Sequence, residues 1–398
     1  MKSLNNSEII FMEKGVRSSA AFLDSKPHYA LLDGLRGVAA LMVVWYHVFE
    51  GFAFAEGTAP IEGFNHGYLG VDFFFMLSGF VISYAYDDRW QASSGAKLTV
   101  GSFFRRRQIR LHPMLVMGAL IGCVAYLLQG SVQWDGTDVS LGRVLLALLL
   151  ALFFIPAWPG ASYDVRGNGE TFSLNGPSWS LFFEYIGNIV YALLLRRLSS
   201  RALAGVVLTT GIAWAYFAVA DVSAYGMVGV GWTLDTMNLI GGVLRMMFPF
   251  TLGMLMARHF KLIRVRGIFW ISSVLLCMLF AVPYIPVMAG VHFNGVYEMV
   301  CIMLVFPCIV WLAASGATTD RFSTGMCNWL GNLSYPLYIV HYPVMYLFYA
   351  WLIDNKVYTL SEAWPMVVAV CAINVLLAQV CLKCYDEPVR RWLARHWK

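Results

Sequence analysis

The chain has 398 residues, of which 59% are hydrophobic and only 13% are charged. Soluble domains carry roughly 25% charged residues, so this composition excludes an ordinary water-soluble domain and indicates a surface that meets lipid. The net charge of +5 is small, and no basic face lies outside a few short loops, which argues against a nucleic-acid partner. Apolar runs recur from Leu31 to Cys384, and they predict an all-α, polytopic integral membrane helix bundle.

Ten segments have the length and apolarity of membrane-spanning helices. They are 31–50, 67–86, 111–129, 177–196, 202–220, 238–257, 267–286, 296–314, 329–353 and 363–384. An eleventh apolar run, 141–157, conflicts with the distribution of charge. The stretch 158–176 that follows it is rich in Gly, Asn and Ser, and is either an outer loop over a site or a plain connector.

Lysines and arginines predict the orientation of the helices, because they accumulate in cytoplasmic loops. They cluster before the first helix and again at 105–110, 196–201, 258–266 and 390–398. All these clusters can face the cytoplasm, together with both termini, only if 141–157 adds no crossing. We therefore expect 141–157 to be re-entrant, to lie at the outer interface, or to cross with a compensating re-entry nearby.

The first spanning segment contains an unusual pair of ionisable residues, Arg36 and His47, which are eleven residues apart. Eleven steps of about 100° bring both side chains to one helical face, and the rise of about 16 Å puts His47 near the membrane midplane. Asp33 lies close to the same stripe. A histidine at that depth requires a polar partner or a cavity, so it is either functional or hydrogen-bonded between helices.

The second and third segments add further candidates. Asp72 and Ser78 lie in the block GVDFFFMLSGF, where Asp72 is either an orienting group or an interfacial carboxylate. Arg107 and Arg110 share a helical face ahead of Pro113, which is expected near the start of the next helix. Such a pair either anchors the topology or binds a phosphate-bearing ligand through forked hydrogen bonds.

Glu184 lies one helical turn after Ser180 in the fourth segment, with Trp179 alongside. A carboxylate beside an imidazole orients it and raises its basicity, so Glu184 is the first candidate to orient His47, ahead of Asp33 and Asp72, unless it forms an interhelical hydrogen bond to an unrelated partner. Late in the chain, five tyrosines follow helical spacing beside His341, as a packing stripe or a ligand path: Tyr335, Tyr338, Tyr342, Tyr346 and Tyr349. Eight scattered cysteines indicate packing and no metal site.

These blocks, taken in order from Leu32 to about Arg391, resemble the membrane-bound acyltransferase family 3. The motifs that carry the resemblance are Asp33–Gly37 followed by His47, the block GVDFFFMLSGF, Arg107 with Arg110, Asn175–Pro177 with Trp179 to Glu184, and LSYPLYIVHYP. The resemblance implies an enzyme that takes an acyl group, commonly acetyl, from cytoplasmic acyl-coenzyme A. The acceptor would be a hydroxyl of a glycan, a glycolipid or another exported molecule.

The resemblance also assigns roles. It makes His47 the catalytic residue, paired with Arg36, and makes Arg107 with Arg110 an element on the acyl-coenzyme A side. His47 could deprotonate the acceptor hydroxyl or carry the acyl group itself. Residues expected to line the site or orient substrate are Asp33, Asp72, Ser78, Asn175, Trp179, Ser180, Tyr338 and His341.

The expected organisation is a cytoplasmic segment 1–28, a membrane acyltransferase domain 29–392 in the bacterial inner membrane, and a cytoplasmic tail 393–398. Many relatives carry a C-terminal extracytoplasmic esterase-like domain. None is expected here, so a separate partner enzyme could supply that step. The main alternative is a multi-pass transporter or exporter of a small solute, but no inverted repeat supports it.

Overall fold

The computed structural model describes residues 29–57, 63–91, 98–260, 267–316, 318 and 320–397. The expected cytoplasmic segment 1–28 and the last residue lie outside this part of the chain. Every named secondary-structure element within the described residues is helical, which confirms the all-α prediction. Nine helical stretches are long and apolar enough to cross a bilayer, so the described chain has the build of a polytopic membrane helix bundle.

The helices follow one another with short connections in most places. Their bounds are α2 Ala30–Glu56, α3 Gly70–Gln91, α4 Val100–Leu128, α5 Leu141–Leu152, α6 Ser178–Leu193, α7 Ser200–Val219, α8 Thr236–His259, α9 Ile268–Ala281, α10 Phe293–Val300, α11 Phe306–Ser315, α12 Arg321–Asn355, α13 Leu360–Cys381 and α14 Glu387–His396. Short 3₁₀ turns, η2 His66–Leu69 and η3 Leu195–Arg197, precede α3 and follow α6. Two π-helical turns join longer rods, with η4 Cys301–Val305 between α10 and α11, and η5 Leu382–Asp386 between α13 and α14.

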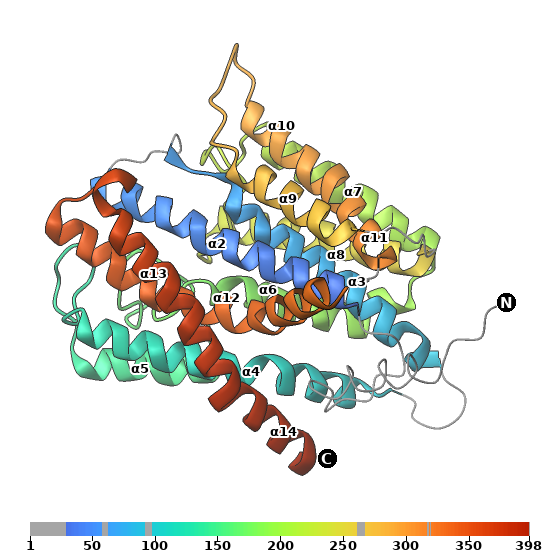
Figure 1. Ribbon diagram of the computed structural model, residues 1–398, viewed down its shortest axis with the longest axis horizontal. Helices are drawn as coiled ribbons and strands as arrows, with labels where there is room; N and C mark the ends of the chain where they lie inside the picture. The colour runs from blue at the N-terminus through green and yellow to red at the C-terminus, as the bar shows by residue number, and fades with distance from the viewer. Residues whose placement is uncertain are drawn as a thin grey trace.

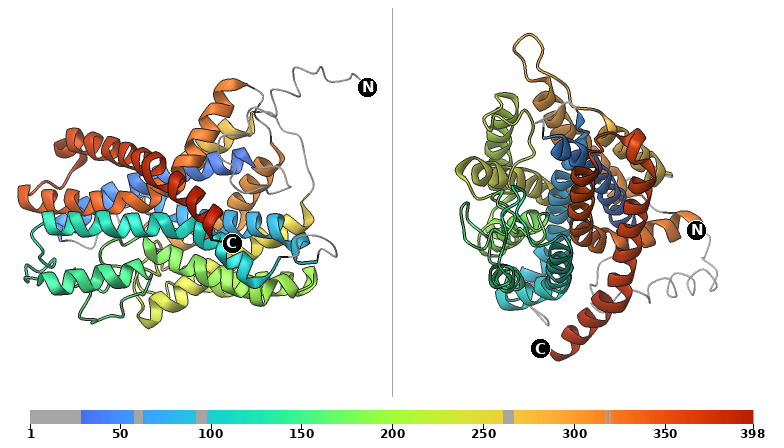
Figure 2. Two further views of the ribbon diagram at one scale, coloured as in Figure 1. Left: turned by 90° about the horizontal axis from the view of Figure 1, so that it is seen from below. Right: turned by 90° about the vertical axis from the view of Figure 1, so that its left-hand side faces the viewer.

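Two helices, α2 and α12, run side by side through the middle of the bundle (Figures 1 and 2). The helix α3 packs along α8, and α12 also contacts α4 and α13. The remaining helices flank this centre, with α4 and α5 on one side and α7, α9, α10 and α11 on the other (Figure 1). The helix α4 contacts α12 and α6, and Ser180 of α6 reaches Tyr338 of α12, so α2, α4, α6 and α12, which carry most of the candidate residues, are linked to one another.

Glycines permit the tight contact between α3 and α8. A Cβ atom on Gly79 would lie 1.9 Å from the carbonyl oxygen of Phe250, and one on Gly253 would lie 2.2 Å from that of Met76. Small residues allow close backbone approach between membrane helices, where packing replaces the hydrophobic effect as the driving force. These two positions hold the second spanning helix against α8.

One expected boundary is wrong in the third spanning helix. The helix α4 begins at Val100 rather than near 111, because the Thr99 side chain accepts a hydrogen bond from the Ser102 amide and Ser102 completes a capping box. Pro113 therefore lies inside α4 and not near its start. The arginine-rich stretch 105–110 is consequently helical, and its side chains project from the first turns of a spanning helix.

Two apolar segments form helices too short to cross by themselves. The span expected at 267–286 forms α9, 14 residues or about 21 Å, because Pro283 and Pro286 follow within five residues of its end. The conflicting run 141–157 forms α5, 12 residues or about 18 Å, against a hydrocarbon core of about 30 Å. The length of α5 favours a re-entrant or interfacial segment over a full crossing.

Arginines gather at one end of the bundle. Arg258 at the end of α8 donates to Asp87 of α3 at 2.8 Å and to the carbonyl oxygen of Leu198 after α6. The guanidinium of Arg196 lies 4.0 Å from the ring centroid of Trp90, near the end of α3. These contacts place the C-terminal ends of three spanning helices together. The side of the membrane that this end faces stays a prediction.

Candidate active site

The imidazole of His47 is hydrogen-bonded to Glu50 on the same helix, three residues further along α2. The distance from His47 Nδ1 to Glu50 Oε2 is 2.7 Å, and the two side chains keep 14% and 26% of their surface exposed. An ionised carboxylate only accepts hydrogen bonds, so the proton of this pair lies on Nδ1. The other ring nitrogen, Nε2, is left with a lone pair that can accept a proton.

Three tyrosine hydroxyls also reach the Glu50 carboxylate. Tyr342 and Tyr349 donate to Oε2 at 3.1 and 2.8 Å, and Tyr46 lies 3.4 Å from Oε1. The Tyr349 hydroxyl is also 2.8 Å from the carbonyl oxygen of His47. Donors around an anion stabilise its charged form. Tyr342 and Tyr349 of α12 therefore fix the position of the Glu50 side chain and link α2 to α12.

A second histidine, His341 of α12, faces His47 with ring centroids 5.1 Å apart. Its Nδ1 lies 2.9 Å from the carbonyl oxygen of Tyr338, so Nδ1 carries the hydrogen. Its Nε2 is buried and has no hydrogen-bond partner among the described residues. An unpartnered buried nitrogen beside the His47–Glu50 pair marks the place where a substrate group would complete the hydrogen bonding.

The expected partners of His47 are wrong. Glu184 instead accepts from Arg107 of α4 at 2.6 Å and from Ser78 of α3 at 2.9 Å. Asp33 pairs with Arg36 at 2.8 Å on the same helix. The sequence misplaced the orienting carboxylate because the predicted first helix ended at Glu50, whereas α2 continues to Glu56. The spacing of three residues after His47 was the available signal for Glu50.

Asp72 also lies away from His47, in a fully buried ion pair. Arg245 of α8 contacts Asp72 Oδ2 at 3.0 Å and donates to the carbonyl oxygens of Tyr68 and Val230 at 2.7 and 3.0 Å. The ring of Trp179 lies 5.2 Å from this guanidinium. Asp72 and Trp179 therefore belong to a structural cluster between α3, α6 and α8.

Arg107 and Arg110, which were predicted to bind the coenzyme, lie close to Arg36 and Glu184. Arg36 of α2 interacts electrostatically with Arg107 and Arg110 of α4 and with Glu184 of α6. Arg107 is buried, while Arg110 is exposed. The Nε–H groups of Arg106 and Arg107 are buried without a hydrogen-bond partner among the described residues. We call Arg36, Arg107 and Arg110 the arginine group; they have donors to spare for an anion.

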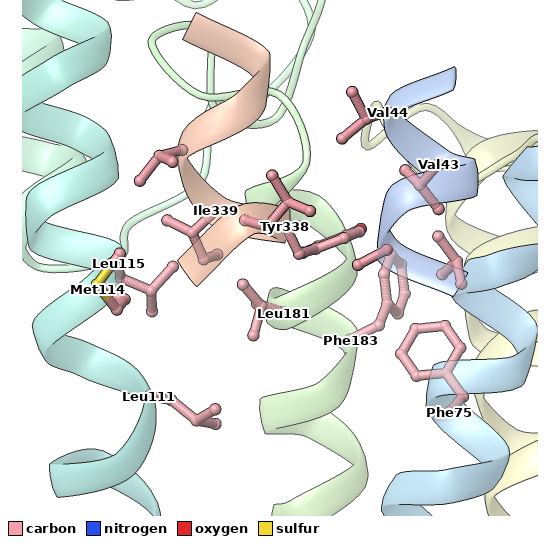
Figure 3. Close-up of a cluster of buried hydrophobic side chains, with 14 of the residues drawn as sticks. Val43, Val44, Phe75, Leu111, Met114, Leu115, Leu181, Phe183, Tyr338 and Ile339 are labelled. Atoms are coloured by element: carbon pink, nitrogen blue, oxygen red, sulfur yellow. The ribbon is translucent and has the colours of Figure 1, made fainter. Parts of the chain in front are cut away.

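Apolar side chains occupy the level between the arginine group and His47. Figure 3 shows them converging from five helices, with Leu111, Met114 and Leu115 from α4, Leu181 and Phe183 from α6, Ile339 and Tyr338 from α12, Val43 and Val44 from α2, and Phe75 from α3. The Tyr338 hydroxyl is 2.6 Å from that of Ser180. This apolar layer lies about one helical turn from His47 and separates the arginine group from the imidazole.

The loop between α5 and α6 packs against α4 and against Tyr342 and Tyr346 of α12. A Cβ atom on Gly122 of α4 would lie 1.9 Å from the carbonyl oxygen of Leu174, which shows how closely the loop follows α4. Both amide atoms of the neighbouring Asn175 are buried without a hydrogen-bond partner among the described residues. The next residue, Gly176, donates its amide hydrogen to Tyr346 at 3.2 Å. The loop is therefore packed onto the helices of the candidate site rather than being a plain connector, and its outer position stays a prediction.

Two charged residues of this loop are buried against α12. Arg166 lies 3.3 Å from the ring centroid of Tyr346 and donates to the Ser173 carbonyl oxygen and to Gln129. Tyr346 donates a hydrogen bond to Glu170. Burial raises the pKa of Glu170 to about 7, and the positive charge of Arg166 limits the rise. The loop therefore has its own buried polar contacts.

Comparison with known proteins identifies the family. The acyltransferase domain of the acyltransferase 3 family matches residues 29–383. The chain belongs to this family. This confirms the resemblance found in the sequence motifs, and with the nine long apolar helices among the described residues it makes the chain a multi-pass membrane acyltransferase.

Individual relatives agree with this assignment. The chain is 26% identical to acyltransferase MdmB of Streptomyces mycarofaciens over 92% of each chain. It is 24% identical to the peptidoglycan O-acetyltransferase OatA of Listeria monocytogenes over 92% of this chain, and this spans 56% of OatA. It is also 37% identical to protein 2 in the picA locus of Rhizobium radiobacter, over 41% of this chain and 81% of that protein. No solved structure matches the chain.

Proposed function

We propose that the chain transfers an acyl group, acetyl in the simplest case, from acyl-coenzyme A to a hydroxyl of a glycan or glycolipid. The observation that carries this proposal is the His47–Glu50 pair, whose geometry leaves Nε2 as a base. The relatives named as O-acetyltransferases support a hydroxyl acceptor and an acetyl group. The arginine group supports a donor that carries phosphates, because arginine binds phosphate through forked hydrogen bonds.

The reaction needs a base that takes the proton of the acceptor hydroxyl and then passes it to the leaving thiolate, and His47 can do both. His47 Nε2 accepts the proton of the acceptor hydroxyl while the hydroxyl oxygen attacks the thioester carbonyl carbon. Glu50 stabilises the imidazolium that forms. The tetrahedral intermediate then breaks its carbon–sulfur bond, and the leaving thiolate takes the proton from His47. The products are the acyl ester and free coenzyme A, so no proton is gained or lost overall.

Neighbouring groups can position the two substrates. Helical rise places Arg36 about 16 Å from His47 along α2, which suits a thioester arm that crosses the apolar layer while its phosphates stay with the arginine group. The unpartnered amide nitrogen of Asn175 can donate a hydrogen bond to the thioester carbonyl oxygen, and the free Nε2 of His341 can accept one from the acceptor alcohol. The arginine-rich end would face the cytoplasm, where the donor is made.

A labelling experiment tests the function directly. The purified chain in nanodiscs would receive acetyl-coenzyme A with a radioactive acetyl group and a cell-envelope glycan fraction. We expect label in the glycan as an alkali-labile ester, in equal amount to the free thiol released. Saturable binding of an exported solute, with no thiol release from any acyl-coenzyme A, would contradict the proposal and favour a transporter.

A further inference from the structure

The C-terminal helix contributes a fourth arginine beside the arginine group. Arg390 of α14 pairs with Asp386 of η5 at 2.8 Å, with 30% of the Arg390 side chain exposed. Arg110 of α4 lies within electrostatic range of both residues. The C-terminal helix α14 therefore packs against α4, the helix that carries Arg107 and Arg110.

A local departure from α-helix produces this placement. The rod formed by α13 and α14 is interrupted by the π-helical turn η5, which ends at Asp386. Asp386 is buried to 1% exposure although the helix that follows it has no buried residue. Such turns insert one extra residue and change the direction in which later side chains point, and they recur at functional sites. Here the turn directs Asp386 toward Arg110 and lets it hold Arg390.

The pair has unused hydrogen-bonding capacity. Arg390 Nε and Asp386 Oδ1 are both buried and have no partner among the described residues. Arg36, Arg107 and Arg390 each have a carboxylate partner, in Asp33, Glu184 and Asp386. Arg110 forms no ion pair within the described chain and is exposed, so it provides the uncompensated positive charge. The spare Nε–H of Arg390 and the charge of Arg110 together suit a compact dianion.

We propose that Arg390, held by Asp386 and acting with Arg110, binds the 3′-phosphate of the acyl-coenzyme A donor. This inference rests on the proposed function, because it assumes that donor. Coenzyme A carries its diphosphate and its 3′-phosphate on separate arms of the ribose. The arginines also come from different elements, with Arg36 on α2, Arg107 on α4 and Arg390 on the C-terminal helix α14. A phosphate monoester carries nearly two charges at neutral pH, which suits Arg390 together with the exposed Arg110.

The test compares coenzyme A with 3′-dephospho-coenzyme A, which lacks only this phosphate. Binding of each to the full chain would be measured by calorimetry in phosphatidylcholine nanodiscs. We expect wild type to bind coenzyme A at least about tenfold more tightly, and Arg390→Gln to reduce this ratio to near one by weakening coenzyme A binding alone. Arg390→Lys keeps the charge but not the forked donors, and should give an intermediate ratio.

Arg395→Gln is the matched control, because Arg395 is exposed on the same helix and should leave the ratio unchanged. A wild-type ratio near one, or an unchanged ratio in Arg390→Gln, would overturn the inference while leaving the donor assignment intact. Failure of both nucleotides to bind wild type would refute the proposed function as well. A lipid headgroup is the other possible ligand of Arg390. In that case phosphatidylglycerol would raise the melting temperature of wild type but not of Arg390→Gln, and both proteins would show the same ratio of affinities for coenzyme A and 3′-dephospho-coenzyme A. That result would show the inference to be wrong.

Discussion

Replacing Glu50 by glutamine isolates the charge of the carboxylate from its hydrogen bonds. The amide oxygen of the new side chain can still accept from His47 Nδ1 and from the hydroxyls of Tyr342 and Tyr349, which meet at one carboxylate oxygen. The nitrogen end then points toward Tyr46, whose hydroxyl can accept. The imidazole therefore keeps its orientation and its free Nε2. What is lost is the negative charge that stabilises the imidazolium while His47 holds the proton.

The size of the effect follows from this difference. A hydrogen bond to a charged group contributes about 1.5–3 kcal/mol and one between neutral groups about 0.5–1.5 kcal/mol, so loss of the charge alone costs about 1–1.5 kcal/mol and corresponds to a fall in kcat of about 5- to 13-fold. The interaction is made more strongly as the charge develops, so kcat should fall while KM for acyl-coenzyme A changes little. A much larger loss would mean that the introduced amide reverses the imidazole tautomer.

The assay is acceptor-dependent thiol release by the purified protein, with kcat and KM measured separately. Glu56→Gln is the matched control, because Glu56 is exposed at the end of the same helix. Wild-type kcat in Glu50→Gln, or a change confined to KM, would refute the assignment of Glu50 as the residue that positions and stabilises His47. An equal loss in Glu56→Gln would point to a general effect of charge on α2.

Three further predictions concern the scaffold. Gly122→Ala places a methyl group against the backbone of the loop between α5 and α6 and should cost about 1–3 kcal/mol by thermal unfolding, while Gly142→Ala, in open space, should cost nothing measurable. Asp72→Asn leaves Arg245 as an unpaired buried charge and should lower stability by about 3–5 kcal/mol, with a much smaller effect on kcat. Folding raises the pKa of Glu170 from 4.5 to about 7, so the folded chain binds this proton more tightly than the unfolded chain does. The free energy of unfolding of wild type should therefore fall by on the order of 3 kcal/mol as the pH rises from 4.5 to about 7. Glu170→Gln should remove this part of the pH dependence of stability.

Hydropathy was sufficient for most of the fold. Runs of apolar residues predicted the nine spanning helices of the described residues, because a single segment that crosses lipid can satisfy its backbone hydrogen bonds by itself only as a helix. Ends were harder to place. Capping by Thr99 extended α4 through a charged stretch, and prolines after Ala281 shortened α9. These are local features that a hydropathy average does not register.

The candidate site was predicted as a set of residues but not as a set of pairs. His47 stood out because ionisable residues are rare at membrane depth, Arg36 because it shares a helical face with His47, and Arg107 because it shares one with Arg110. Their partners depend on how the helices are rotated and packed, which one sequence does not reveal. Glu184 reached Arg107 rather than His47, and Glu50 was overlooked because it stood at the last residue of the expected span 31–50, whereas α2 continues for six more residues.

The central claim is that His47 acts as the base of an acyl transfer from acyl-coenzyme A. The most direct measurement is acceptor-dependent thiol release by His47→Gln, beside His396→Gln as a control in the exposed part of α14. We expect no release above background from His47→Gln and wild-type release from His396→Gln, with the melting temperature and the binding of coenzyme A unchanged in both. Release at the wild-type rate by correctly folded His47→Gln would contradict the account.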